Sequence, residues 1–223
     1  MESTQIFSSI SKLLTSSFER EFWLNLQDEL AASYANANAI VESAQARIDR
    51  PEKVRLLPQM RHYFLNAAFR RAAIASGLVC TDAMTEPKGE NYCIVQSGGI
   101  KVSRIGLKHD EHLIKRAHHR TLIAQLNSEL EGFTPDLFQE ITIPAHPEGT
   151  LGVLIVNVNP PYVLPQSTMM DLRVTVPFTN LNSYHYNQSI SDILALYNES
   201  ESVPELPDLA IPQLKKRLKQ QEG

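Results

Sequence analysis

A histidine-rich stretch between residues 109 and 120 carries side chains that could bind a metal ion or a phosphate group. It reads HDEHLIKRAHHR, with four histidines, an Asp-Glu pair and three basic residues. Zinc needs three or four converging ligands, and the chain has no close-spaced CxxC or HxxxH pair to supply them. We therefore expect no metal site. A metal-dependent hydrolase is only a third alternative, and its ligands would be His109, His112, His118 and His119.

Two segments of the chain are strongly basic, although the formal net charge of the whole is -4. Residues 101–120 carry a net +4 and residues 47–71 a net +5. Arginine predominates in the second segment, and its planar guanidinium suits bidentate pairing with phosphate or carboxylate. The competing interpretation is a solvated helix face. The predicted phosphate-binding or nucleic-acid-binding residues are Arg55, Arg61, Arg70, Arg71, Lys108, Lys115, Arg116, His119 and Arg120.

Motifs of the common enzyme classes are missing from the sequence. It contains no GxxxxGK[ST], GxGxxG, GxSxG or HExxH, the signatures of nucleotide binding, serine hydrolysis and zinc proteases. Arg55 with His62, and Glu86 with Lys88, have spacings found in some nucleases, but a proline lies between the members of each pair. We expect no catalytic residue and no cofactor, so an enzyme is the less favoured interpretation.

The N-terminal third predicts helices. Residues 4–17 have one apolar face, and residues 18–48 contain neither proline nor glycine. A new helix could begin at Pro51, with Asp49 as its cap, but the main body of the third helix is predicted to start at Pro58 and to end at Gly77. The second helix has apolar residues at intervals of three and four, close to a coiled-coil seam. The seam residues are Trp23, Leu26, Leu30, Tyr34, Ala37, Val41, Ala44 and Ile48.

The pattern then changes to one typical of strands. Residues 91–96 and 100–107 flank Ser97-Gly98-Gly99, which predicts a β-hairpin. A second strand pair is predicted at 150–159 and 171–178. Between and after the pairs we expect helices at 113–131 and 189–198. A polar turn is expected at Tyr184-His185-Tyr186, either as a strand-to-helix connection or as an exposed binding loop.

Together these patterns predict an α+β protein. Its helical N-terminal half (1–77) should pack with an antiparallel sheet of about four to six strands in an α+β region (78–198). Residues 199–223 are rich in proline and acid and then basic, which predicts a linker and a flexible C-terminal arm.

The cysteine count and the hydropathy bear on the cellular compartment. Two cysteines, Cys80 and Cys93, are too few for a disulfide-rich secreted fold, so we expect buried free thiols in a reducing cytoplasm. The N-terminus has no basic-then-apolar leader, and no apolar run approaches the roughly 20 residues that span a bilayer. We expect a cytoplasmic protein with no membrane association.

The leading functional hypothesis is a non-catalytic interaction protein, for example a regulatory, inhibitory or assembly subunit. An apolar seam and an apolar arm should leave surface that a protein partner or a second copy covers. The predicted partner-binding residues are Trp23, Leu30, Leu206, Leu209, Leu214 and Leu218. The alternative is a nucleic-acid-binding protein or nuclease that uses the two basic segments.

Overall fold

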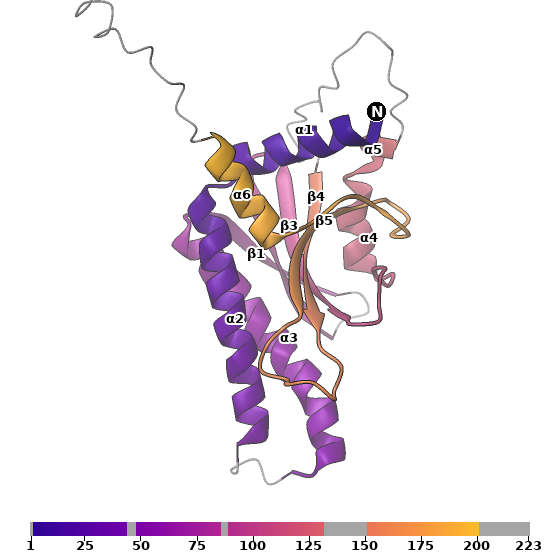
Figure 1. Ribbon diagram of the computed structural model, residues 1–223. Coiled ribbons are helices and arrows are strands. Elements are labelled where there is room, and N and C mark those ends of the chain that lie inside the picture. The colour runs from indigo at the N-terminus through magenta and orange to yellow at the C-terminus, as the bar shows by residue number, and fades with distance from the viewer. Residues whose placement is uncertain (1, 44–47, 86–88, 132–150, 201–223) are drawn as a thin grey trace, which may run out of the picture.

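The computed structural model describes residues 2–43, 48–85, 89–131 and 151–200. Figure 1 shows the order of its elements along the chain. The helices are α1 (Glu2–Ser17), α2 (Arg20–Glu42), α3 (Arg50–Ala75), α4 (His118–Gln125), α5 (Ser128–Glu131) and α6 (Ile190–Ser200). The strands are β1 (Val79–Met84), β2 (Asn91–Ser97), β3 (Ile100–Lys108), β4 (Leu151–Asn159), β5 (Asp171–Pro177) and β6 (Tyr184–Ser189).

The strands form one six-stranded sheet in the order β1-β2-β3-β4-β5-β6. This confirms the predicted α+β class, the hairpin β2–β3 and the antiparallel pair β4–β5. One pair departs from the expected antiparallel pattern. Strands β3 and β4 are parallel, because the chain crosses over through the segment that contains α4 before it returns to the sheet.

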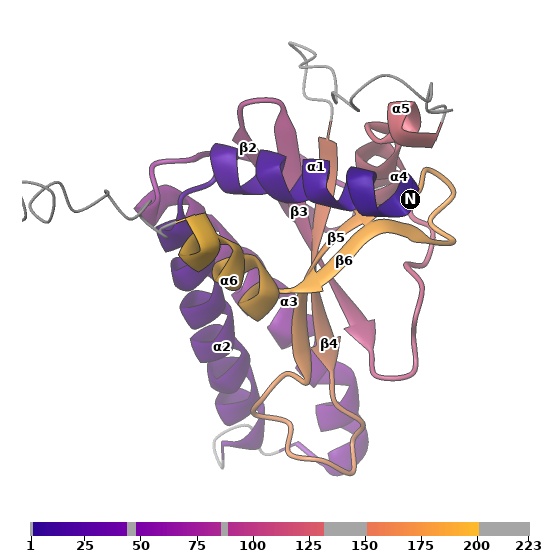
Figure 2. The ribbon, with the colours of Figure 1, turned by 45° about the horizontal axis from the view of Figure 1, so that its top comes forward.

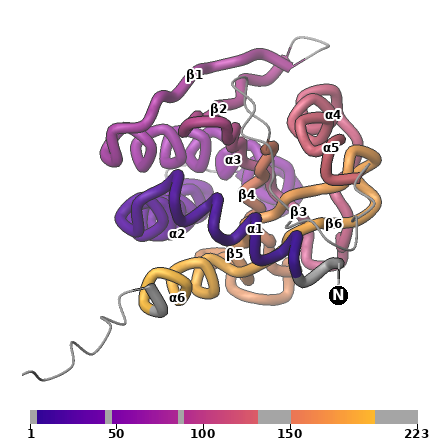
Figure 3. The backbone as a smooth tube through the Cα atoms, turned by 90° about the horizontal axis from the view of Figure 1, so that it is seen from above, coloured from indigo at the N-terminus to yellow at the C-terminus, as the bar shows by residue number. Residues whose placement is uncertain are grey.

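Helices cover both faces of the central strands (Figures 2 and 3). Helices α1, α2, α3 and α6 pack on one face around a large core, and α4 packs on the other around a smaller one. Residues alternate between the two cores along β3 and β4. Val102 and Val153 face the large core, whereas Ile105 and Leu154 face the small one. Burial on both faces explains why β4 reads as a continuous apolar run.

The seam of α2 is covered by the chain's own helices. Its six seam residues from Trp23 to Val41 are all buried, and α2 packs mainly along α3. Trp23 and Leu30 are fully buried, so neither side chain is offered at the surface, and their role in partner binding stays a prediction. Trp23 also donates its indole N–H to the hydroxyl of Tyr197 on α6 at 2.8 Å. The predicted arm residues Leu206, Leu209, Leu214 and Leu218 lie outside the described residues.

Helix α3 is continuous through Pro58, which corrects the expectation that a helix starts there. It begins at Arg50 after Asp49, with Pro51 in its first turn, which agrees with the alternative start at Pro51. Proline has no backbone N–H, so Pro58 leaves the carbonyl of Val54, four residues earlier, without its helical donor. The hydroxyl of Tyr162, in the loop after β4, donates to that carbonyl at 3.1 Å. A residue distant in sequence thus compensates for the proline.

Two further predicted elements differ from the structure. The Tyr184-His185-Tyr186 segment is not an exposed turn, because it forms β6 and pairs with β5. The helix expected at 113–131 is shorter and divided, with α4 starting at His118 and α5 at Ser128. The final helix is confirmed at Ile190, and Ser189 and Asp192 cap it by reciprocal hydrogen bonds.

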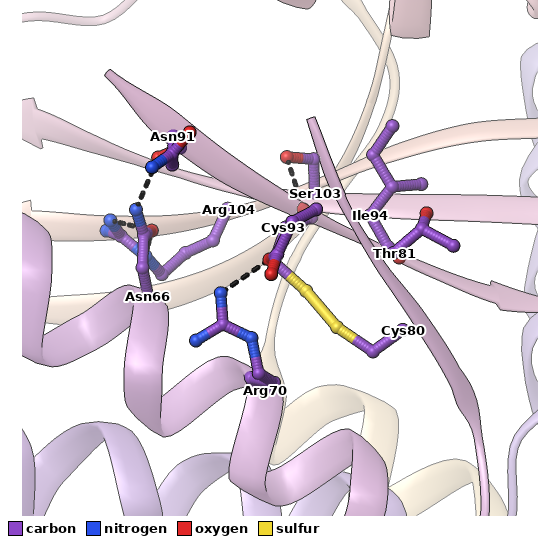
Figure 4. The surroundings of a disulfide bond; sticks show 10 residues. Asn66, Arg70, Cys80, Thr81, Asn91, Cys93, Ile94, Ser103 and Arg104 are labelled. Atoms are coloured by element: carbon purple, nitrogen blue, oxygen red, sulfur yellow. Dashed lines mark hydrogen bonds and ion pairs between the residues drawn. A yellow bond between two sulfur atoms is a disulfide. The ribbon is translucent and has the colours of Figure 1, made fainter. Parts of the chain in front are cut away.

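Cys80 and Cys93 form a disulfide, so the expectation of free thiols is wrong (Figure 4). The bond joins edge strand β1 to β2, where the two residues lie diagonally across the pair. Sequence alone does not reveal which residues two neighbouring strands place side by side. None of the helices in the described ranges combines the length and hydrophobicity that a membrane crossing requires.

Candidate anion-binding site

A pocket of about 510 Å³ opens where the parallel strands β3 and β4 end. Helix α3 forms one wall, the turn after β3 forms another, and the loop after β4 closes the third side. Its lining includes four basic residues, Arg61, Arg104, Lys108 and Arg120. The neutral polar residues include His62, Asn157, Asn159 and Gln166, and the apolar ones include Pro58, Leu65, Leu107, Pro160, Pro161 and Tyr162.

Arg104 lies at the base of the pocket and is only 6% exposed. It projects from β3 towards α3, where neutral oxygens hold its guanidinium. It donates to the amide oxygen of Asn157 at 2.7 Å and to that of Asn66 at 2.8 Å, with a longer contact to the carbonyl of His62. Burial, with a smaller contribution from Arg120, lowers the pKa of Arg104 to about 10.

Two further arginines reach the same pocket from other elements. Arg61 of α3 stacks over the ring of Tyr34 at 4.1 Å and donates to the carbonyl and side-chain oxygens of Gln166. Arg120 of α4 donates to the carbonyl of Lys115. The Nε atoms of both arginines are buried and have no hydrogen-bond partner among the described residues. Burial lowers the pKa of both guanidinium groups.

A chain of amide groups fixes the base of the pocket. Asn157 donates to the side-chain oxygen of Asn159 at 3.2 Å, and that oxygen also accepts from the hydroxyl of Tyr34 at 3.0 Å. Asn159 in turn donates to the carbonyl of Leu107. A Cβ atom at Gly106 would lie 3.3 Å from the Asn157 amide, so glycine there keeps the base open. These side chains orient Arg104 without neutralising it.

The two histidines nearest the arginines stay neutral at neutral pH. Burial and then Arg104 lower the pKa of His62, against the opposing effect of Glu90. The amide of Asn66 is 3.1 Å from Nε2 of His62, so that lone pair accepts a hydrogen bond when the ring is neutral. Burial, followed by Arg120, lowers the pKa of His119 to about 4.

Negative charge is scarce in the lining of the pocket. Asp110 and Glu111 are the acidic lining residues, and Glu111 pairs with Lys115. Within the described ranges, no carboxylate forms an ion pair with Arg61, Arg104 or Arg120. Buried charges in proteins are normally paired. The pocket therefore has an excess of buried positive charge, which an anion would neutralise.

The structure brings only some of the predicted binding residues to this pocket. Those that line it are Arg61, Lys108 and Arg120. His119 lies beside it, with its ring 4.7 Å from that of Tyr92. The ion pairs Arg70–Asp82, Arg71–Glu29 and Lys115–Glu111 occupy three others. Arg55 and Arg116 are exposed and do not line the pocket.

Sequence reasoning missed the residues at the base of the pocket. Arg104 counted only as one charge of a basic segment, although an arginine inside an apolar strand is a signal of a buried cation. Asn157 and Asn159 interrupt the apolar run of β4 on the face that points to α3, which is a comparable signal. Asn66 and Gln166 gave no signal, because polar residues on a helix or in a loop are ordinary.

The four histidines of the 109–120 stretch do not converge. In the part of the chain that the structure describes, no group of three or more His, Cys, Asp or Glu side chains could hold a metal ion.

No protein-family model matches the chain, and no similar curated protein or solved structure was found. The chemistry of the pocket therefore has to be argued from its own residues, and those residues favour binding of an anion.

Proposed function

We propose that this protein is a non-catalytic binding protein for a phosphate-bearing ligand, which it holds in the arginine-lined pocket. The observation that carries the proposal is that the buried Arg61 and Arg104 and the half-buried Arg120 line one pocket, and that none of the three forms an ion pair with a described carboxylate. Guanidinium forks match the geometry of phosphate oxygens, so an anion would supply the missing acceptors. The Nε atoms of Arg61 and Arg120, which are buried without a hydrogen-bond partner among the described residues, also favour a bound anion.

The electrostatics also favour an anion. Burial costs free energy for each positive charge, which is why the pKa of Arg104 falls to about 10. An anion beside the guanidinium would favour its charged form and recover that cost. Ligand binding should therefore stabilise the folded protein, by about 2.7 kcal/mol when the ligand concentration is 100 times the Kd.

Titration of the purified chain with inorganic phosphate, by calorimetry and by thermal unfolding, tests the proposal. Phosphate should bind and raise Tm, and Arg120→Met should weaken binding at least about tenfold. Arg116→Met is a matched control, because Arg116 is an exposed arginine in the segment just before α4 and lies outside the pocket. Equal loss in both variants, or no saturable binding of phosphate or of any phosphate ester, would overturn the proposal.

Association with another protein is a second proposal, now without the α2 seam. Three consecutive apolar residues in the loop after β4 support it: Tyr162, Val163 and Leu164, of which Val163 is 90% exposed. Sedimentation of the full chain, alone and with proteins that copurify from its host, tests this idea. A complex that Val163→Asp dissociates would support it, and a complex unchanged by Val163→Asp would exclude this loop.

A cytoplasmic location is likewise a proposal. The Cys80–Cys93 disulfide weighs against it, because disulfides persist mainly in oxidising compartments.

Nucleic-acid binding is the alternative function for the basic residues. Arg55 and Arg116, which are exposed, would contact a nucleic-acid backbone in that case. In that case the affinity of the protein for DNA or RNA should fall steeply as salt is added.

A further inference from the structure

We infer that the pocket takes a phosphate monoester of a compact aromatic group, of the size of a mononucleotide, rather than inorganic phosphate or a nucleic-acid backbone. The inference rests on the proposed function, because it names the class of ligand for the same pocket. It is carried by the presence of both arginines and apolar side chains in the lining of one pocket, and by the way in which Tyr162 is anchored there.

The pocket is larger than a phosphate group needs. Its volume of about 510 Å³ falls within the range of cavities that hold small organic ligands, roughly 300 to 1,000 Å³. Arg61 of α3 bonds Gln166 in the loop that carries Tyr162, whereas Arg104 of β3 lies at the base of the pocket. A phosphate bound there would leave most of the volume to the group that it carries.

Part of the lining is apolar and contains an aromatic ring. Pro58 contributes from α3, and Pro160, Pro161 and Tyr162 contribute from the loop after β4. Tyr162 is 53% exposed, so its ring can be covered by a ligand. Proline and tyrosine rings offer flat faces to an aromatic ligand, and aromatic pairs contribute beyond simple area burial.

Tyr162 is fixed before any ligand arrives. Its hydroxyl donates to the Val54 carbonyl that Pro58 leaves free. Gln166, in the same loop, donates to the carbonyls of Pro161 and Leu164 and accepts from Arg61. The loop is thus tied both to α3 and to one of the pocket arginines. A ring that is already positioned loses little conformational entropy on binding.

A second hollow of about 430 Å³ lies on the other side of this loop. It shares Tyr162 and Gln166 with the arginine pocket and is lined by Ile48, Val54 and Leu57 among others. The far end of a longer ester therefore has apolar surface available beyond Tyr162. Lys53 in this hollow forms an ion pair with Glu42, so its positive charge is already neutralised, unlike the charges of the arginines in the first pocket.

A polymeric backbone fits the pocket less well than a single ester. Arg61 and Arg104 are each only 6% exposed, so a phosphate must enter the pocket to reach them. Asp110 and Glu111 in the lining would repel the neighbouring phosphates of a polyanion, and the chain as a whole carries a net charge of -4. A single terminal phosphate avoids that repulsion.

The test compares four probes by calorimetry with the full chain: inorganic phosphate, phenyl phosphate, adenosine 5′-monophosphate and an unphosphorylated single-stranded DNA oligomer. Both esters should bind about tenfold more tightly than inorganic phosphate, and the oligomer should bind more weakly than the esters. Tyr162→Ala should bring both esters to the affinity of inorganic phosphate and leave phosphate itself unchanged. Tyr63→Ala, which removes a tyrosine of similar exposure (55%) outside the pocket, should change neither.

Equal affinities of phosphate and the esters would overturn this inference and leave the proposed function standing. Tightest binding by the oligomer would also overturn it, in favour of a nucleic-acid backbone. If none of the three small anions binds, the proposed function fails and this inference fails with it. Circular dichroism and thermal unfolding of each variant confirm that a loss of affinity does not reflect a loss of folding.

Discussion

The hydroxyl of Tyr162 donates a hydrogen bond to the backbone carbonyl of Val54 at 3.1 Å. That carbonyl is available because Pro58, four residues later in α3, has no N–H to donate to it. A proline that weakens the helix therefore also anchors the loop that forms one wall of the pocket. Pro58 therefore affects both the stability of α3 and the position of the pocket loop, and substitutions can measure the two effects separately.

Replacing Pro58 with alanine restores an N–H that competes with Tyr162 for the Val54 carbonyl. Unfolding should cost about 1 to 3 kcal/mol more, since proline is unfavourable inside a helix. Phenyl phosphate should bind several-fold more weakly, whereas inorganic phosphate should bind unchanged. Urea unfolding and calorimetry measure the two effects. Pro51→Ala, in the first turn of α3, is the control and should show neither.

Asn157→Asp places a carboxylate at the position that now holds the Arg104 guanidinium through a neutral oxygen. The resulting ion pair should raise the pKa of Arg104 and neutralise the charge that attracts an anion. We expect phosphate affinity to fall at least about tenfold, because one pKa unit of interaction corresponds to a tenfold change. Asn36→Asp, on the exposed surface of α2, adds the same charge without this loss. Unchanged binding in Asn157→Asp would place the anion away from Arg104.

His119 should make the protein sensitive to acid. Burial, with Arg120, His62 and His118, lowers its pKa from 6.5 to about 4 in the folded state. Between these two values the unfolded chain binds a proton that the folded chain does not. Stability should therefore be complete above pH 6.5 and decline as the pH falls towards 4. His119→Gln should flatten this part of a stability-versus-pH curve, and His112→Gln, an exposed control, should leave it unchanged.

Gly152 is required for the contact between β4 and α4. A Cβ atom there would lie 1.8 Å from the carbonyl oxygen of Ile123, a distance that neither backbone can accommodate without moving. Asn127 also bonds both the N–H and the carbonyl of Gly152. Gly152→Ala should destabilise the fold by about 3 kcal/mol or more. Chemical unfolding measures this loss of stability. Gly98→Ala is the comparison variant, because a Cβ there meets nothing within 4 Å, so any loss of stability in it comes from backbone strain at φ +52° and not from a steric clash.

Trp23 should contribute to folding and not to association. It is fully buried, packs against Phe18 and Phe22, and bonds Tyr197. Trp23→Ala should reduce the free energy of unfolding by about 3 to 5 kcal/mol. At concentrations where the variant is still folded, its sedimentation coefficient should equal that of the unsubstituted chain. A folded variant that has lost an oligomer would restore the seam as an interface.

Local patterns in the sequence determined most of the secondary structure. The spacing of apolar residues and the turn and capping residues are enough to predict α1, the β2–β3 hairpin around Ser97-Gly98-Gly99 and the helix cap at Ser189. These features depend on neighbouring residues alone. Pro58 shows the limit of such rules. The helix continues through it because packing of α3, and a hydrogen bond from a loop over 100 residues away, outweigh the local preference.

Only the tertiary structure decided what covers the seam, which strands pair in parallel and where the basic residues meet. Arg61, Arg104 and Arg120 belong to α3, β3 and α4, three elements that line the same pocket only in the folded chain. The sequence determined that both segments are basic, since charge is a property of composition. It could not determine which of those charges are buried together, because burial depends on contacts between residues far apart in the chain.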